Sequence, residues 1–186
     1  MNTCLVTGGC GFIGSNLVHT LVDDGWQVEI VDDLSAGDLE FLGELDKRVV
    51  HVDMLSIFEH KFKEGLQEGE LLVITGDFAH KNVLERIKQQ KYDCVFHLAA
   101  RPRVEVSVRD PVTTTEINLF KTVALFNACR DVVKRVVFSS SSSVYGDAQE
   151  FPTKEGHLKT PRSPYALQKL CGEQFARLFK SLYDQD

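Results

Sequence analysis

The sequence predicts an α/β fold, with a doubly wound, mainly parallel sheet and helices on both of its faces. Short apolar runs alternate along the chain with helical patterns, which is the arrangement of parallel strands joined by crossover helices. A glycine-rich segment directly follows the first apolar run, where such folds place a tight turn. The length of 186 residues fits one domain with a sizeable core, so we expect residues 1–186 to form a single domain.

Apolar runs of strand character recur along the chain. Five of them are expected to form the sheet: Cys4–Val6, Gln27–Val31, Leu71–Thr75, Cys94–Leu98 and Arg135–Ser139. A sixth run, Arg48–Val52, also has strand character, and the charged segment Ser56–Glu68 after it has helical character. One strand is therefore extra relative to the simplest alternation of strands and helices.

Helical spacing of apolar residues predicts the connections between these strands. After the first strand, such spacing is shown by Ile13, Leu17, Val18 and Leu21. Gly25 then supplies a left-handed stop for this helix. Later helices are expected at Asn82–Lys91, Thr115–Arg130 and Tyr165–Tyr183.

Composition and charge exclude several classes of function. The chain is 43% hydrophobic and 26% charged, as soluble proteins are, and its net charge of -6 argues against a nucleic-acid partner, which needs a basic face. No apolar window reaches the ~18 residues of a membrane span. The five cysteines form no C-x-x-C pair, so we expect a reducing, cytoplasmic location. The histidines lack metal-ligand spacing, so no metal is expected.

The glycine-rich segment Thr7–Asn16 is the first candidate for chemistry. It contains G-x-G-x-x-G on Gly9, Gly11 and Gly14, or G-x-x-G-x-x-G with Gly8 in first place. Glycines permit a tight turn and the close approach of backbone amides to a pyrophosphate, which the amino terminus of the next helix also favours. A glycine-rich turn without a ligand has the same pattern, so the motif alone leaves both interpretations open.

Two aspartates, Asp32 and Asp33, end the second predicted strand, about twenty residues after the glycines. A carboxylate at this place can accept hydrogen bonds from an adenosine ribose diol, and it repels a 2′-phosphate. The pattern therefore favours NAD over NADP as cofactor. The alternative is a solvated acidic pair in a turn.

Tyr165 and Lys169 lie four residues apart on the last predicted helix, so they share one face of it. The lysine ammonium can then lie beside the phenol, or beside a ribose that both residues contact. We expect the positive charge to lower the pKa of Tyr165 from its usual ~10, which would make proton transfer usable near neutral pH. Pairs with this spacing also arise by chance.

Four segments together resemble the extended short-chain dehydrogenase/reductases, and within them the NAD-dependent nucleotide-sugar epimerase/dehydratase family. They are Thr7–Asn16, His97–Ala100, Ser139–Gly146 and Ser163–Lys169, and they stand in the order and spacing of that family. The resemblance covers nearly the whole chain, and UDP-sugar 4-epimerases give the nearest pattern. It implies a Rossmann-like domain with the dinucleotide across the carboxyl ends of the strands.

The resemblance also implies roles for single residues. Cofactor-binding positions of the family fall on Gly8, Gly11, Phe12, Ile13, Gly14, Asp32, Asp77, Phe78, Ala99, Ala100, Asn118, Tyr165 and Lys169. Among them, the glycines approach the pyrophosphate, Asp32 the adenosine ribose and Asp77 the adenine amino group. Arg101 stands one residue before a lysine of the family pattern, and the region between Arg48 and Glu70 contains an insertion relative to it.

The family's catalytic positions fall on Ser141, Tyr165 and Lys169. The resemblance implies that Ser141 positions a sugar hydroxyl and Tyr165 removes its proton, while Lys169 holds the nicotinamide ribose and NAD accepts a hydride. The implied activity is that of an isomerase, the 4-epimerisation of a UDP-sugar through a transient 4-keto intermediate. A dehydratase or decarboxylase of the same family and a catalytically silent NAD-binding module are the alternatives.

Three further expectations follow from the resemblance. Dehydratases of the family have Asp and Glu directly after the catalytic hydroxyl residue, where this chain has Ser142 and Ser143, so epimerisation is favoured. Relatives continue well beyond the tyrosine helix, so we expect residues 1–186 to be the N-terminal part of a longer protein. Such a part would lack the C-terminal substrate domain, expose the sheet edge at Arg135–Ser139 and be inactive alone. The family also implies a homodimer.

Overall fold

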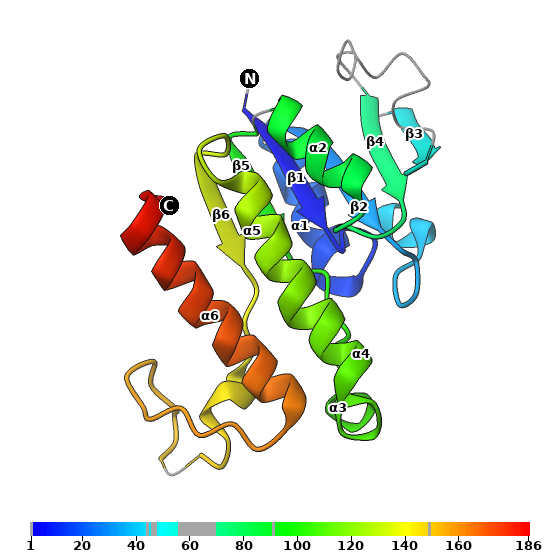
Figure 1. The fold of residues 1–186 in the computed structure, drawn as a ribbon. Coiled ribbons are helices and arrows are strands. Elements are labelled where there is room, and N and C mark those ends of the chain that lie inside the picture. The colour runs from blue at the N-terminus through cyan, green and yellow to red at the C-terminus, as the bar shows by residue number, and fades with distance from the viewer. Residues whose placement is uncertain (1, 44, 46–47, 56–69, 91, 149) are drawn as a thin grey trace.

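Six strands form one sheet in the computed structural model, which describes residues 2–43, 45, 48–55, 70–90, 92–148 and 150–186. The strands are β1 (Thr3–Thr7), β2 (Gln27–Asp32), β3 (Arg48–Asp53), β4 (Glu70–Thr75), β5 (Cys94–His97) and β6 (Arg135–Phe138). Their order is β3-β4-β2-β1-β5-β6, and all neighbours are parallel. The predicted parallel sheet is confirmed (Figure 1).

Helices cover both faces of the sheet, as predicted. α1 (Phe12–Asp23) lies behind it in Figure 1, while α2 (Lys81–Gln90), α5 (Lys121–Cys129) and α6 (Pro164–Tyr183) lie in front. Successive residues of β1 face opposite sides, so Val6 packs in one apolar cluster with Val18 of α1, and Leu5 in the other with Leu125 of α5. No helix in the described part of the chain is long and apolar enough to span a membrane.

The chain before α5 is irregular where one continuous helix was expected. It forms α4 (Pro111–Thr115) and then a π-helical turn, Glu116–Phe120. Wide turns of this kind occur often at functional sites. A short helix, α3 (Val104–Arg109), comes before them and was not expected, because its valines alternate with polar residues as they do in a strand.

The extra strand of the sequence is β3, which pairs with β4 at the outer edge of the sheet. β4 pairs with β2, and the strand predicted at Leu71–Thr75 is confirmed. The turn after β4 therefore reaches the end of β2, where Gly76 N donates to the carbonyl oxygen of Asp32 at 2.9 Å. The helix expected at Ser56–Glu68 lies outside the described residues.

The opposite edge of the sheet is formed by β6. Val136 N donates to the carbonyl oxygen of Asp186 at 2.8 Å, and the Arg135 guanidinium pairs with the Asp186 carboxylate. The side chain of Gln185 donates to the carbonyl oxygen of Val133 at 3.0 Å. The residues after α6 thus lie against β6, and the prediction of an uncovered edge is wrong at Val136.

Candidate active site

A cavity of about 640 Å³ lies among the loops that follow β1, β2, β4, β5 and β6. This is where doubly wound folds bind ligands, since the chain reverses its strand order between β1 and β5. The predicted site residues that line it are Gly8, Gly11, Phe12, Ile13, Gly14, Asp32, Asp77, Phe78, Ala99, Ala100, Ser141, Tyr165 and Lys169. The tertiary structure therefore brings together residues as far apart in the sequence as Gly8 and Lys169.

Two glycines, one in the loop between β1 and α1 and one in the first turn of α1, leave no room for a side chain. Gly8 has a φ of +74°, and a Cβ there would lie 2.8 Å from the backbone nitrogen of Ala99, after β5. A Cβ on Gly14 would lie 2.0 Å from the carbonyl oxygen of Gly8. The first approach holds the loop after β1 against the residues that follow β5, and the second seats the start of α1 against the loop after β1.

The first turn of α1 lies at the cavity. Amides in the first turn of a helix have no acceptor within the helix, and Gly11, at the N-cap, has no side chain to accept from them. Phe12 and Ile13 line the cavity in this turn. The positive end of the helix dipole lies at the same place, so the loop fits a pyrophosphate.

Asp32 ends β2 and is 7% exposed. Its Oδ2 accepts a hydrogen bond from Cys10 N and its Oδ1 one from Leu34 N, each at 2.9 Å. Burial raises the pKa of Asp32, and these two hydrogen bonds act in the opposite direction. A carboxylate oxygen with one donor retains acceptor capacity, so the predicted ribose position holds a carboxylate that two amides already orient.

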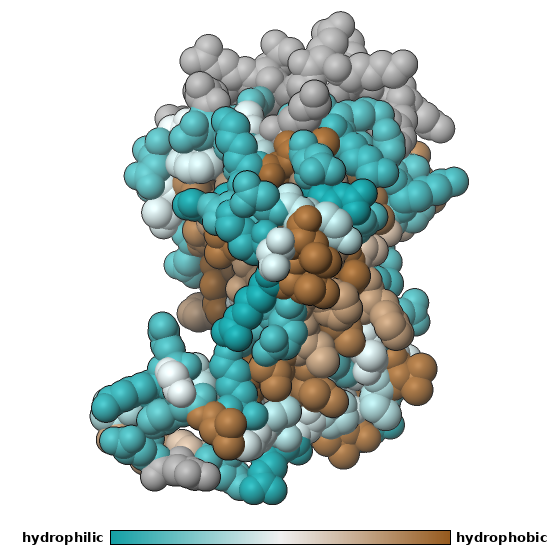
Figure 2. All heavy atoms as spheres, turned by 60° about the vertical axis from the view of Figure 1, so that its left-hand side comes forward, coloured by the Kyte–Doolittle hydropathy of each residue, from teal (hydrophilic) through white to brown (hydrophobic). Residues whose placement is uncertain are grey.

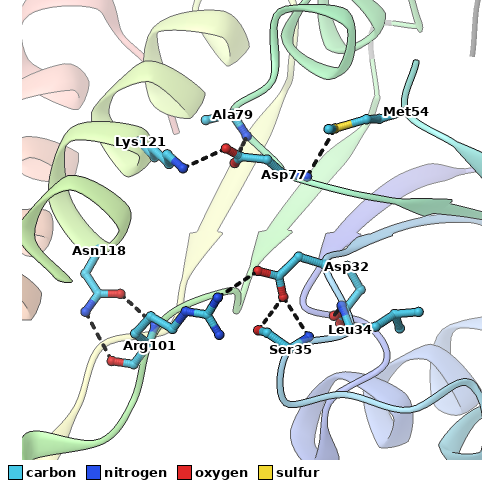
Figure 3. A network of polar contacts seen from close by, with 10 residues as sticks. Asp32, Leu34, Ser35, Met54, Asp77, Ala79, Arg101, Asn118 and Lys121 are labelled. Carbon is cyan, nitrogen blue, oxygen red and sulfur yellow. Dashed lines mark hydrogen bonds and ion pairs between the residues drawn. The ribbon is translucent and has the colours of Figure 1, made fainter. Parts of the chain in front are cut away.

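An ion pair joins the loops after β2 and β5 where they line the cavity. Arg101 Nη2 lies 3.2 Å from Asp33 Oδ2. Asn118, in the π-helical turn, holds the Arg101 backbone, since its Oδ1 accepts from Arg101 N at 2.8 Å and its Nδ2 donates to Arg101 O at 3.2 Å (Figure 3).

Asn118 differs from its predicted role as a cofactor contact. Its second amide hydrogen is donated to Gln168 Oε1 on α6 at 2.8 Å, so both of its N–H groups are used within the protein. The side chain is 1% exposed and is not among the groups that line the cavity. In this structure Asn118 links the loop after β5 to α6 by hydrogen bonds.

A second ion pair, Asp77 with Lys121, joins the loop after β4 to α5. Asp77 Oδ2 lies 2.6 Å from Lys121 Nζ, and Asp77 Oδ1 accepts from Ala79 N at 2.9 Å (Figure 3). Lys121 was absent from the predicted site, although it lines the cavity. The helical spacing of the sequence predicted that Lys121 lies on a helix. It did not indicate that the side chain of Lys121 faces the cavity.

Helix α6 begins at the residues that carry Tyr165. Ser163 is its N-cap, and the Ser163 hydroxyl accepts from Ala166 N at 3.1 Å. Pro164 occupies the first helical position, where its missing N–H costs nothing. The amide of Tyr165 donates to Ser107 Oγ of α3 at 3.1 Å, so this end of the helix is fixed to a second element.

Ser141, Tyr165 and Lys169 meet at this end of α6. Lys169 is 3% exposed, and its Nζ donates to the carbonyl oxygen of Ser139 at 2.8 Å and lies 6.0 Å from the centre of the Tyr165 ring. The Ser141 hydroxyl accepts from Ser143 N at 3.2 Å and from Ser143 Oγ at 2.8 Å. The Ser141 side chain also lies near the Tyr165 phenol, and both line the cavity. The geometry is that of a positioned hydroxyl, a phenol and an ammonium group.

The direction of the tyrosine pKa shift corrects one prediction. Burial raises the pKa of Tyr165, and the nearby Ser141 side chain lowers it by less. The expected lowering by Lys169 is therefore wrong in this structure, because that ammonium is held at Ser139 O, away from the phenol. Burial also lowers the pKa of Lys169 itself to about 8.

His97 is a structural residue. It is fully buried, with Nδ1 2.7 Å from Thr7 Oγ1 and Nε2 2.9 Å from Thr122 Oγ1. Burial, with a contribution from the Lys169 charge, lowers the pKa of His97 to about 3, so its ring is neutral. Among the described residues, no group of three or more His, Cys, Asp or Glu side chains has the arrangement of a metal site.

The buried Lys169 ammonium predicts a stability gain from its removal. Its folded pKa of about 8 lies below the usual 10.5, so the unfolded chain binds more protons between these values and wild-type stability rises with pH there. Lys169→Met should therefore raise the unfolding free energy at pH 7 by roughly 1–3 kcal/mol, after allowance for the acceptor it leaves at Ser139. The difference in unfolding free energy between the variant and the wild type should shrink as the pH rises above 8. Denaturant unfolding at pH 7 and 10 measures this difference. A variant less stable than the wild type at pH 7 would contradict the prediction.

The fold and the cavity define a Rossmann-type dinucleotide-binding domain with a serine, a tyrosine and a lysine beside the dinucleotide crevice. A family model described as GDP-mannose 4,6 dehydratase matches residues 5–185. The chain belongs to the nucleotide-sugar epimerase/dehydratase family of short-chain dehydrogenase/reductases.

Known relatives agree with this assignment. The chain is 36% identical to the UDP-glucose 4-epimerase of Mycolicibacterium smegmatis over 98% of its own length and 52% of that protein. A structure of the UDP-N-acetylglucosamine 4-epimerase of Methanobrevibacter ruminantium with UDP-N-acetylmuramic acid aligns at a TM-score of 0.80 and 35% identity, over 100% of this chain and 52% of that one. A structure of the UDP-glucose 4-epimerase of Brucella ovis with NAD aligns at a TM-score of 0.79 and 28% identity, over 100% of this chain and 50% of that one. The chain thus spans about half the length of these relatives.

Proposed function

We propose that this chain is the NAD-binding half of an NAD-dependent UDP-sugar 4-epimerase, and that its site residues other than Asn118 have the roles implied by the family. The observation that carries the proposal is a single cavity lined both by the glycine loop with Asp32 and by Ser141, Tyr165 and Lys169. Relatives named as UDP-glucose 4-epimerases support it. Because the chain spans about half of each relative, turnover belongs to a longer protein that supplies the sugar pocket.

The residues present fit NAD. Gly8 and Gly14 have no Cβ, so the backbone can turn tightly there and come close to a pyrophosphate. The first-turn amides of α1 would bind that group, and Asp32 would accept hydrogen bonds from the adenosine ribose. When bound, NAD supplies a hydride acceptor that later returns the hydride.

The chain's own residues handle the proton. Tyr165 removes the proton of the sugar 4-hydroxyl, and Ser141 holds that hydroxyl by a hydrogen bond. Burial alone keeps Tyr165 protonated, so the positive charges of Lys169 and of an oxidised nicotinamide are needed to favour the phenolate. After the keto-sugar turns over, Tyr165 gives the same proton back. No net oxidation results.

The absence of acid and base side chains at two positions predicts the product. Loss of water from a 4-keto sugar needs a proton donor at the leaving hydroxyl and a base at carbon, and the Ser142 and Ser143 hydroxyls are too weakly acidic for either task. We therefore expect the longer protein to interconvert 4-epimers of a UDP-sugar without net NADH release. Mass spectrometry should find no 4-keto-6-deoxy product, and its formation at a comparable rate would make the chain part of a dehydratase.

A catalytically silent NAD-binding protein is the second candidate function. It would bind NAD but show no absorbance of bound NADH when UDP-sugar is added. The trio of Ser141, Tyr165 and Lys169 argues against it, because dinucleotide binding alone does not require a buried lysine and a buried phenol on one helix face.

Asp32 predicts the choice between cofactors. A buried carboxylate at the ribose repels a 2′-phosphate, so NAD should bind at least about tenfold more tightly than NADP. Asp32→Asn should shrink that ratio, while Asp24→Asn, exposed at the far end of α1, should leave it unchanged. Calorimetric titration measures both affinities. Equal binding of the two dinucleotides by the wild type would remove Asp32 from this role.

A homodimer and a cytoplasmic location complete the proposal. Leu167, Leu178 and Leu182 on α6 are 52%, 48% and 61% exposed and share one helix face, which supports a second copy as partner. Figure 2 shows apolar side chains gathered among polar ones on the side where α6 lies. All five cysteines are free, which supports a reducing compartment.

A further inference from the structure

A carboxylate of α6 holds the serine segment that follows β6. Glu173 Oε1 accepts a hydrogen bond from Ser140 Oγ at 2.6 Å, and the side chain of Glu173 is only 17% exposed. Ser140 stands between Ser139, whose carbonyl oxygen accepts from Lys169 Nζ, and Ser141. All three serines line the cavity, whereas Glu173 does not. Any effect of Glu173 on a ligand there passes through the segment that it holds.

Three residues of α6 follow this segment along one side of the helix. Tyr165, Lys169 and Glu173 are spaced by four residues, so they succeed one another on that side. The segment Ser139–Ser141 bonds to Lys169 and to Glu173 and lies near Tyr165. A Cβ on Gly172 would lie 2.6 Å from an aromatic carbon of β6, so helix and strand approach closely here (Figure 1). Glu173 therefore fixes how the segment lies along the helix.

A second contact fixes the carboxylate itself. Lys159 Nζ forms an ion pair with Glu173 Oε2, and the Lys159 side chain is 18% exposed. Thr160 Oγ1 donates to the carbonyl oxygen of Tyr145 at 2.9 Å, so the loop that carries Lys159 is tied to the 3₁₀ turn after the serine segment. Burial raises the pKa of Glu173, but the hydrogen bonds from Lys159 and Ser140 outweigh burial and hold that pKa below its usual range. Glu173 is therefore charged at neutral pH.

This largely buried pair fixes geometry more than it stabilises the fold. Withdrawing a carboxylate and an ammonium from water costs about as much free energy as their attraction returns. A hydrogen bond to a charged group is nevertheless strong and directional. Proton transfer depends on such geometry, because a displacement of about 1 Å can lower a rate about 10²-fold.

We infer that Glu173 is a positioning residue, which holds Ser140 so that Ser141 and the carbonyl oxygen of Ser139 stay where the proton transfer requires them. The inference rests on the proposed function and adds to it a residue outside the positions implied by the family. Lys159 supports the role by keeping the carboxylate charged and in place.

Kinetics of the longer protein test this role. Glu173→Ala removes both contacts of the carboxylate. Glu173→Gln keeps the shape, since its amide can donate to Ser140 Oγ and accept from Lys159 Nζ. We expect Glu173→Ala to lower kcat about tenfold or more, while KM and the NAD content stay within about threefold of the wild type. Glu173→Gln should restore kcat to within about threefold.

Two further variants separate positioning from a general structural effect. Ser140→Ala removes the same hydrogen bond from its other end, so it should lower kcat about as much as Glu173→Ala, and the double variant should be slower than either by less than about threefold. Glu85→Ala is the control and should leave kcat unchanged. Glu85 also accepts from an amide and pairs with a lysine, but it is 51% exposed and does not line the cavity.

Amide hydrogen exchange of the 186-residue chain measures the hold without catalysis. Exchange in residues 139–146 should be faster in Glu173→Ala than in the wild type, and unchanged in Glu173→Gln and Glu85→Ala. Equal exchange in Glu173→Ala and the wild type would show that the carboxylate does not hold the segment, which refutes the inference.

The kinetic outcomes separate this inference from the proposed function. An active wild type whose Glu173→Ala variant keeps kcat within about threefold refutes the inference and leaves the epimerase standing. A loss that adds to that of Ser140→Ala, or that Glu173→Gln shares in full, also refutes it. A longer wild-type protein without epimerase activity refutes the proposed function, and the inference with it. Thermal melting shows which variants fold, and Ser140→Ala decides in the same way if Glu173→Ala does not.

Discussion

Tyr165→Phe in the longer protein is expected to lower the rate of UDP-sugar epimerisation by about 10²- to 10⁴-fold, the usual contribution of a positioned acid or base. The change removes one oxygen from a side chain that is 8% exposed and lines the cavity with Ser141. NAD binding should change little, because the pyrophosphate and adenosine positions lie on other loops. A coupled assay gives kcat and KM, and the NAD content of the purified protein gives the binding control.

Tyr183→Phe is the matched control for this prediction. Tyr183 ends the same helix, is 42% exposed and does not line the cavity, so its loss of a hydroxyl should leave kcat unchanged. A Tyr165→Phe protein with near wild-type kcat would show that another group moves the proton. Loss of bound NAD in parallel with kcat would show that the phenol contributes to binding rather than to proton transfer.

Gly14→Ala is expected to destabilise the chain by about 3 kcal/mol or more, at the upper end for overpacking. Alanine is favoured over glycine in a helix by about 1 kcal/mol, so intrinsic propensity alone predicts a gain. The new Cβ would lie 2.0 Å from the carbonyl oxygen of Gly8, however, and backbone atoms there cannot move aside as a flexible side chain can. The clash should decide the sign. α1 would shift away from the end of β1, and NAD affinity should fall with stability.

Gly156→Ala is the control for this substitution. A Cβ at Gly156 meets nothing within 4 Å, so its effect should stay within about 0.5 kcal/mol. Urea unfolding of the two variants measures the difference between them. If Gly14→Ala were as stable as Gly156→Ala and bound NAD normally, the tight seating of α1 would not be needed for the cofactor loop.

The sequence pattern alone was enough to identify those site residues whose backbone conformation or helix face depends only on residues close to them in the sequence. Gly8, Gly11 and Gly14 indicate a tight strand-to-helix turn, and the structure gives that turn, with no room for a side chain at Gly8 and Gly14. Tyr165 and Lys169 share a helix face wherever the helix lies, because residues four apart always do. The alternation of apolar runs and helical patterns likewise predicted the parallel sheet.

Tertiary structure alone decided the features that depend on what another element brings into contact. Lys121 lines the cavity because α5 packs with that side toward the loop after β4, and Asn118 is turned inward onto Arg101 and Gln168. The pKa of Tyr165 rises because packing buries its phenol, while Ser139, on a separate strand loop, holds Lys169 back from it. Sequence spacing determines which residues share a face of one element. The direction that face takes, and the water that packing removes from it, are set by the free energy of assembling all the elements together.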